Sequence, residues 1–327
     1  MATETLARNV VESGQRAAAR SNTSAGTETR TATFRVWRGT AAQGQLTDYP
    51  TKVSEGMVVL DAIHQIQAEQ ATDMAVRWNC KAGKCGSCSA EINGMPRLMC
   101  MTRLSELDLS EPITVEPMRA FPLVKDLVTD VSSNFRAKKR IRKFTPRPPD
   151  APDGTWRMSQ YDVDRVQEFR KCIECFLCQN VCHVLRDHQL HEQFVGPRLL
   201  VHAAQLEMHP LDILDRRDEL KDVDGIGYCN ITKCCTKVCP EHITITDNAI
   251  IPLKERVVDR HFDPLGKLVR LIRGKRAGSG KWEAGVLRSE RAVQSEAYLE
   301  GSGSARDSEG GTIPPYQSVV GGREYLP

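Results

Sequence analysis

The chain has 327 residues, a formal net charge of +3 and 12 cysteines. A charge so close to zero gives no sign of a nucleic-acid-binding surface, and we expect no nucleic-acid partner. The cysteines fall into three tight groups between Cys80 and Cys239, whereas a secreted disulfide scaffold is shorter and spreads its cysteines along the chain. This clustering is typical of metal ligation in a reducing compartment.

The two ends of the chain lack the pattern of a folded domain. Residues 1–30 have no apolar stretch of a secretory signal, and their glutamates argue against an organelle transit peptide, so we expect a disordered tail. Residues 274–327 include "GSGSARDSEGG" and are expected to be mostly disordered. No apolar run approaches the roughly 18 residues that span a bilayer, so we expect any membrane association to come through partners.

Residues 31–120 show the pattern of a small mixed sheet that packs on one helix. Four stretches carry the period of strands or of a hairpin: 32–39, 47–56, 88–100 and 112–117. The dipeptide Asn93-Gly94 marks the turn of the hairpin. Between the strands, residues 57–70 place their apolar side chains on one helical face.

Residues 121–273 show helical periodicity instead. Four helices are predicted, at 121–135, 161–172, 196–208 and 251–262. The Pro-rich stretch 145–154 is expected to be a loop between them. The change of period near residue 120 predicts two ordered domains of the α+β class.

The first cysteine group has the spacing C-x4-C-x2-C, followed by one more cysteine beyond the hairpin. Its members are Cys80, Cys85, Cys88 and Cys100. This is the plant-type ferredoxin arrangement for a [2Fe–2S] cluster. Gly83 and Gly86 let the backbone wrap closely around a cluster, so that N–H groups point at its sulfurs. The alternative is a structural zinc site, but zinc ribbons favour paired C-x2-C motifs.

The second and third groups form an internal repeat. The stretch "CIECFLCQNVC" has the spacing C-x2-C-x2-C-x3-C of bacterial ferredoxins, at Cys172, Cys175, Cys178 and Cys182. The stretch "CNITKCCTKVCP" repeats this spacing with Cys229, Cys235 and Cys239, and Thr232 stands where the second cysteine would be.

In two-cluster ferredoxins, the fourth cysteine of each run binds the cluster of the other run. Crossed ligation predicts a [4Fe–4S] cluster held by Cys172, Cys175, Cys178 and Cys239. The other cluster then receives only three thiolates, from Cys182, Cys229 and Cys235, which suits [3Fe–4S]. Cys234 is out of register and is expected to be a free thiol that is buried as a small hydrophobic side chain or lies beside the cluster. The alternative is a bent backbone that lets Cys234 complete a [4Fe–4S] cluster.

These motifs, together with "PLVKDLV", resemble the iron–sulfur subunit of succinate dehydrogenase/fumarate reductase over about residues 31–265. The resemblance implies a plant-type ferredoxin β-grasp domain at 31–120, followed by an all-helical, bacterial-ferredoxin-like two-cluster domain at 121–273. It also implies an electron-transfer subunit that is active only within a complex. No dinucleotide fingerprint or acid–base constellation is found, so we expect no catalytic residues in this chain.

The resemblance also implies the partners, as they occur in that family. A flavoprotein subunit with FAD oxidises succinate to fumarate, and electrons pass through the three clusters to quinone at a membrane anchor, with or without haem b. The direction of flow does not follow from the sequence, so fumarate reduction is an alternative. There are two rival hypotheses. In the first, the chain serves another flavoenzyme complex. In the second, it is a zinc-stabilised interaction protein without redox chemistry.

The chain departs from the family around the expected quinone site. His183 replaces a common Pro, Asp187 a common Trp and Asn230 a common His. We therefore take His183, Asn230 and Thr232 as candidate surroundings of the quinone or the third cluster, and favour a low-potential quinone such as menaquinone. We expect a peripheral protein on the cytoplasmic side of a bacterial inner membrane, with the matrix side of the mitochondrial inner membrane as the alternative.

Overall fold

The computed structural model describes residues 29–262 and 264, so the expectations for the two tails lie outside the described residues. The described chain contains two hydrophobic cores, one under a β-sheet and one among helices. No helix within this part of the chain is long and apolar enough to cross a bilayer.

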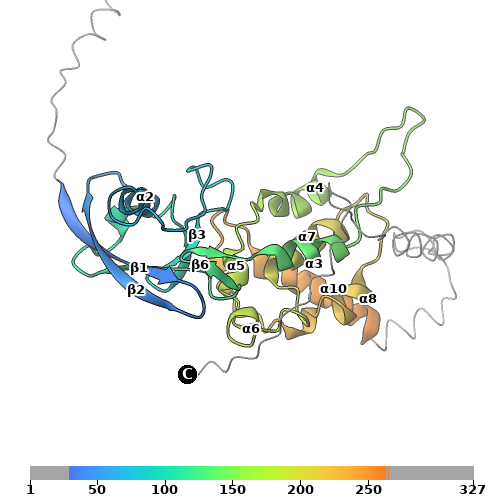
Figure 1. Cartoon of the computed structure of the whole chain (residues 1–327). Helices are drawn as coiled ribbons and strands as arrows, with labels where there is room; N and C mark the ends of the chain where they lie inside the picture. The colour runs from blue at the N-terminus through green and yellow to red at the C-terminus, as the bar shows by residue number, and fades with distance from the viewer. Residues whose placement is uncertain (1–28, 263, 265–327) are drawn as a thin grey trace, which may run out of the picture. The chain divides into compact units, whose positions relative to one another are not determined.

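The first core lies under a five-stranded mixed sheet with the strand order β2-β1-β5-β3-β4. Three of its strands, β1, β2 and β3, are labelled in Figure 1. Its strands are β1 (Arg30–Gly39), β2 (Gly44–Val53), β3 (Ser89–Ile92), β4 (Met95–Leu98) and β5 (Ile113–Glu116). β1 pairs with β5 in parallel, whereas the other pairs are antiparallel. All four predicted strand regions are therefore present.

One helix, α2 (Val59–Glu69), covers this sheet with an apolar face that includes Leu60, Ile63 and Ile66. The hairpin β3–β4 turns at Asn93 and Gly94, whose φ angles of 48° and 74° are those that a type I′ turn requires. After β4, a short 3-10 helix η1 (Leu104–Glu106) leads towards β5.

The prediction of a helix at 121–135 is wrong for the first half of that stretch. Residues there form a small hairpin, β6 (Leu123–Lys125) and β7 (Val128–Thr129), and the helix α3 (Ser132–Arg140) begins only afterwards. The hairpin forms because the buried carboxylate of Asp126 accepts hydrogen bonds from the backbone N–H groups of Gly39 and Ala75, at 2.7 and 2.8 Å. The chain is therefore helical only from residue 132 onwards, not from 121.

Short helices and loops make up the rest of the described chain. They are α4 (Gln160–Gln167), η2 (Glu168–Lys171), α5 (Leu177–Asn180), α6 (His183–Arg186), α7 (Pro197–Glu207), α8 (Arg217–Asp222), η3 (Ile226–Tyr228), α9 (Cys234–Lys237), the π-helix η4 (Ile245–Ile250) and α10 (Ile251–His261). The three remaining predicted helices correspond to α4–η2, α7 and α10. The Pro-rich stretch 145–154 is a loop, as expected.

The internal repeat is visible in the backbone as well as in the sequence. In the first copy, Glu174 and Phe176 have φ angles of 56° and 62°, and α5 begins directly afterwards. At the corresponding positions of the second copy, Ile231 and Lys233 have φ angles of 63° and 61°, and α9 begins directly afterwards. Left-handed conformations are uncommon for such residues, so their recurrence shows that both copies use the same loop.

Candidate metal centres

The first candidate site is the loop between α2 and β3, together with Cys100 after β4. Several backbone N–H groups of this loop point at cysteine sulfurs. Those of Ala82 and Lys84 lie 3.4 and 3.3 Å from the Sγ of Cys80. The N–H of Cys100 lies 3.5 Å from the Sγ of Cys88, which connects the loop to the end of the hairpin. Such donors stabilise thiolates, the form in which cysteine binds iron.

The environment of the sulfurs differs across this loop. Burial raises the pKa of the Cys85 thiol. Hydrogen bonds from Ser87 and the Cys80 amide outweigh this effect and bring the pKa to about 6. Burial raises the pKa of Cys88 to about 12. A buried thiol must lose its proton to bind a metal, so metal binding at this loop is coupled to proton release.

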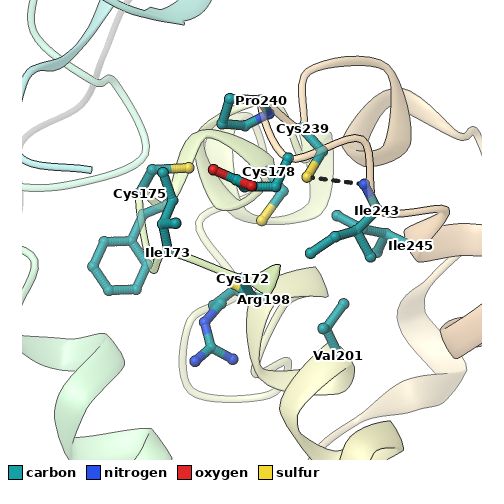
Figure 2. Close-up of a pocket in the computed structure, with 12 residues that line it drawn as sticks. Cys172, Ile173, Cys175, Cys178, Arg198, Val201, Cys239, Pro240, Ile243 and Ile245 are labelled. Atoms are coloured by element: carbon teal, nitrogen blue, oxygen red, sulfur yellow. Dashed lines mark hydrogen bonds between the residues drawn. The ribbon is translucent and has the colours of Figure 1, made fainter. Parts of the chain in front are cut away.

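The second candidate site is a cavity whose walls carry Cys172, Cys175, Cys178 and Cys239 (Figure 2). The first three come from the loop before α5 and from α5 itself, and Cys239 comes from the turn after α9. The backbone N–H of Ile243 donates to the Sγ of Cys239 at 3.4 Å. The structure thus brings together the four cysteines that crossed ligation assigns to one cluster.

The third candidate group lies where the two repeat copies meet again. Burial, with smaller contributions from the thiols of Cys234 and Cys229, raises the pKa of Cys182 to about 11. Burial, together with the same two thiols, also raises the pKa of Cys235, although the hydroxyl of Thr246 at 3.4 Å acts against it. Cys182 and Cys235 therefore each lie close enough to Cys229 and Cys234 for these thiols to affect their pKa values.

The repeat clarifies the position of Cys234. Cys234 opens α9 as Leu177 opens α5, and Leu177 is buried in the first hydrophobic core. Cys235 corresponds instead to Cys178, which lines the cavity of the second site. The Sγ of Cys234 lies 3.3 Å from the hydroxyl oxygen of Thr232.

The candidate quinone surroundings come together in part. The side-chain nitrogen Nδ2 of Asn230 lies 2.9 Å from Nε2 of His183, although the two residues are far apart in the sequence. Asn230 is exposed to solvent and His183 is half-buried. His183 directly follows Cys182 in the sequence. Thr232 contacts Cys234 instead.

The first two sites contact each other through groups that the sequence pattern did not single out. Gly86 lies so close to the second site that a Cβ atom there would be 2.6 Å from the Cα of Cys175. The hydroxyl of Ser89 lies 2.8 Å from the carbonyl oxygen of Cys175. Lys84 and Glu241, each beside a cysteine loop, form an ion pair at 2.9 Å.

A buried carboxylate reinforces this junction. Glu91, on β3, is completely buried. It accepts hydrogen bonds from Asn180 at 2.9 Å and from Arg186 at 3.2 Å, both on the helical side. A glutamate in a strand whose four residues are all buried is the signal that could have revealed this link, because a buried charge needs partners.

The donor set fits iron–sulfur clusters better than single metal ions. The twelve cysteines are all free. Among the described residues, no group of three His, Cys, Asp or Glu side chains is gathered as one ion requires. Four thiolates on one zinc ion would place their sulfurs only about 3.8 Å apart. A cluster instead spreads the four sulfurs over several irons. The four cysteines of the second site line one cavity, as such a cluster requires.

The sequence of this chain is similar to those of known iron–sulfur proteins. Residues 33–136 match the family described as "2Fe-2S iron-sulfur cluster binding domain", and residues 168–243 match "4Fe-4S dicluster domain". The fumarate reductase iron–sulfur subunit of Mycobacterium tuberculosis is 32% identical over 199 residues, which cover 60% of this chain and 79% of that protein. The succinate dehydrogenase iron–sulfur subunit of Paracoccus denitrificans is 28% identical over 63% of this chain and 78% of its own length.

A solved structure is also similar. A chain of the Mycobacterium smegmatis Sdh1 complex in the apo form superimposes with a TM-score of 0.70 and 62% sequence identity. The match covers 72% of this chain and 99% of that one.

Proposed function

Because this chain belongs to the family of succinate dehydrogenase and fumarate reductase iron–sulfur subunits, we propose that it conducts electrons, one at a time, from a flavoprotein subunit to quinone in a membrane-bound complex. The chain carries [2Fe–2S], [4Fe–4S] and [3Fe–4S] clusters. When bound, these clusters supply the one-electron chemistry, and the polypeptide supplies their ligands, their spacing and their electrostatic surroundings.

The proposed ligands follow the three groups of cysteines. Cys80, Cys85, Cys88 and Cys100 hold [2Fe–2S]. The four cysteines around the second cavity, Cys172, Cys175, Cys178 and Cys239, hold [4Fe–4S]. Cys182, Cys229 and Cys235 hold [3Fe–4S], because Cys235 has the register of a ligand and Cys234 does not.

The observation that carries this proposal is the direct contact between the first two cysteine loops. Electron transfer by tunnelling weakens steeply with distance, so successive carriers need adjacent sites. The missing side chain of Gly86 permits contact with the backbone of Cys175, and Ser89 and Glu91 hold the two sides together. The proposed crossed ligation through Cys182 and Cys239 also requires the second and third sites to be adjacent.

The quinone end of the pathway is proposed beside the third site. The contact between His183 and Asn230 supports this location, because it places two polar side chains at an accessible surface next to the ligand Cys182. These groups can donate hydrogen bonds to a quinone carbonyl oxygen. Replacing His183 with Ala is expected to raise the KM for quinone while leaving electron transfer from succinate to a soluble dye unchanged.

The partners are an FAD-containing flavoprotein subunit and a membrane anchor, with or without haem b, and the quinone is menaquinone. We place the chain at the cytoplasmic side of a bacterial inner membrane. The absence of a spanning helix among the described residues agrees with a peripheral subunit. An alkaline wash of the membranes is expected to release the chain, and its retention would contradict a peripheral location.

The test is purification of the chain with its partners, followed by assays of succinate:quinone reductase activity. Reduction of quinone by succinate supports the proposed direction. Faster fumarate reduction by a reduced quinone would support the second candidate, because the relatives include both kinds of subunit. Activity in neither assay, with clusters present, would indicate another flavoenzyme complex.

A further inference from the structure

Arg198 is a buried cation in the wall of the second cysteine cavity. It occupies the first turn of α7, and only 6% of its side chain is exposed. It lines the same cavity as Cys172, Cys175, Cys178 and Cys239 (Figure 2). A guanidinium group stays charged in proteins, so this wall carries a permanent positive charge.

The outer end of Arg198 is held by an ion-pair network. Its Nη2 donates to Glu174, which lies in the loop between Cys172 and Cys175. Lys138, on α3, donates to the same oxygen of Glu174. Two cations therefore share one carboxylate, and the network keeps a net positive charge beside the cavity.

The inner part of Arg198 is not satisfied in the same way. Its Nε is buried and has no hydrogen-bond partner among the described residues. An unpaired donor on a buried charged group is unfavourable, and proteins rarely keep one without a function. Glu241 also lines the cavity, but it forms an ion pair with Lys84 of the first cysteine loop.

We propose that the Nε–H of Arg198 donates a hydrogen bond to a sulfur of the [4Fe–4S] cluster, and that Arg198 thereby raises the reduction potential of that cluster. The inference rests on the proposed ligand set of the second site. Reduction adds one negative charge to the cluster. A hydrogen bond to sulfur and a nearby positive charge therefore stabilise the reduced form more than the oxidised form.

Three substitutions in the purified complex test this inference. Arg198→Gln removes the charge and the Nε–H group. It is expected to lower the potential of the [4Fe–4S] cluster by the equivalent of a tenfold change in its reduction equilibrium, about 59 mV for one electron. Arg198→Lys keeps the charge, and the potential of its [4Fe–4S] cluster is expected to lie between those of Arg198→Gln and the wild type. Lys138→Gln is the matched control, because it also removes a cation from Glu174 but leaves Arg198 in place.

The readout is a redox titration followed by EPR, in which the [2Fe–2S] cluster of the same sample serves as an internal reference. Equal [4Fe–4S] potentials in the wild type and Arg198→Gln would overturn the inference, as would an equal shift in Lys138→Gln. If Arg198→Gln does not assemble, pulsed EPR of the wild type with isotopically labelled arginine tests for the hydrogen bond directly. A nitrogen coupling on the reduced [4Fe–4S] cluster is expected, and its absence would refute the hydrogen bond.

Failure of the ligand assignment gives a different result. Cys172→Ser is expected to abolish or strongly alter the [4Fe–4S] signal. A normal signal in that variant would contradict the proposed ligand set. A normal potential in Arg198→Gln would contradict only the role of Arg198.

Discussion

The hydroxyl of Ser89 donates a hydrogen bond to the backbone carbonyl oxygen of Cys175, 2.8 Å away. Ser89 begins strand β3 directly after the first cysteine loop, and Cys175 lies in the second. This single bond therefore connects the walls of two cofactor sites. Gly86, in the first loop, also lies close to Cys175, since a Cβ atom on Gly86 would meet the backbone of that residue.

Gly86→Ala is expected to separate the two cysteine loops. A Cβ atom at this position would lie 2.6 Å from the Cα of Cys175, so one loop must move. We expect a loss of about 1–3 kcal/mol in stability from overpacking. We also expect weaker magnetic coupling between the first two clusters in EPR spectra of the fully reduced complex.

Gly94→Ala provides the matched control for this change. Gly94 has a φ angle of 74°, similar to the 68° of Gly86, but a Cβ atom there would meet nothing within 4 Å. Its substitution introduces the same backbone strain without a clash, so cluster coupling is expected to stay at the wild-type value. Equal coupling in both variants would show that the contact at Gly86 does not set the spacing.

Glu91→Gln is expected to weaken the junction between the sheet and the helical part. The change removes the negative charge that Arg186 and Arg119 approach at 3.2 and 3.4 Å. Since Glu91 is fully buried, we expect the free energy of unfolding to fall by about 1–3 kcal/mol.

The exposed pair of Arg35 and Asp48 offers the control for Glu91. Asp48→Asn makes the same chemical change in a solvent-exposed pair, and is expected to change stability much less than Glu91→Gln, because water screens an exposed ion pair. Denaturant unfolding of both variants, followed by the loss of cluster absorbance, compares them. A larger effect of Asp48→Asn would contradict the importance of the buried link.

The third site distinguishes two adjacent cysteines. Cys235→Ser is expected to abolish the EPR signal of an oxidised three-iron cluster, whereas Cys234→Ser is expected to keep it. Thr232→Cys should convert the site towards four irons and lower its potential, because Thr232 stands at the position of the missing ligand. If the oxidised wild type is EPR-silent and Cys234→Ser makes the three-iron signal appear, Cys234 is the fourth ligand and the assignment is wrong.

The buried Asp224 predicts a pH dependence of stability. Burial, together with the negative charge of Glu219, raises the pKa of Asp224 to about 6, although Arg140 acts in the opposite direction. The folded protein then keeps a proton that the unfolded chain loses from about pH 4 upwards. Stability is therefore expected to fall by about 3 kcal/mol as the pH rises from 4 to 6, and to lose nothing further from this group above that window.

Asp224→Asn is expected to remove this contribution. The difference in free energy of unfolding between variant and wild type should grow in favour of Asn between pH 4 and 6, when both are measured in the same denaturant series. A difference that stays constant over this range would show that Asp224 does not titrate as proposed.

Features with local causes could be predicted from the sequence. The hairpin turn depends on Asn93 and Gly94 themselves, and the repeat of the cysteine runs depends on short spacings within each run. The cysteine order was also sufficient to identify the family, which the comparisons confirm. The match of Ile231 and Lys233 with the backbone of the first copy then shows that Thr232 occupies the position of Cys175.

Features with distant causes could not be predicted in this way. The stretch "PLVKDLV" has apolar residues at a spacing that a helix also allows, and it forms a hairpin because Asp126 binds backbone groups near residues 39 and 75. A glutamate in the short strand β3 indicates that a partner is needed, but the partners of Glu91 and Ser89 in the helical part lie 86 to 95 residues further along the chain, so no local pattern identifies them. Arg198 was not singled out either, although it stands in the apolar run "PRLLVHAA" and a buried charge requires a partner.

The most direct test of the account is EPR of the purified complex before and after addition of succinate, followed by dithionite. The account predicts a three-iron signal in the oxidised sample, a loss of that signal and the appearance of the [2Fe–2S] signal with succinate, and a further [4Fe–4S] signal with dithionite. A colourless protein that contains zinc instead of iron, or clusters that dithionite reduces but succinate leaves unchanged, would contradict it.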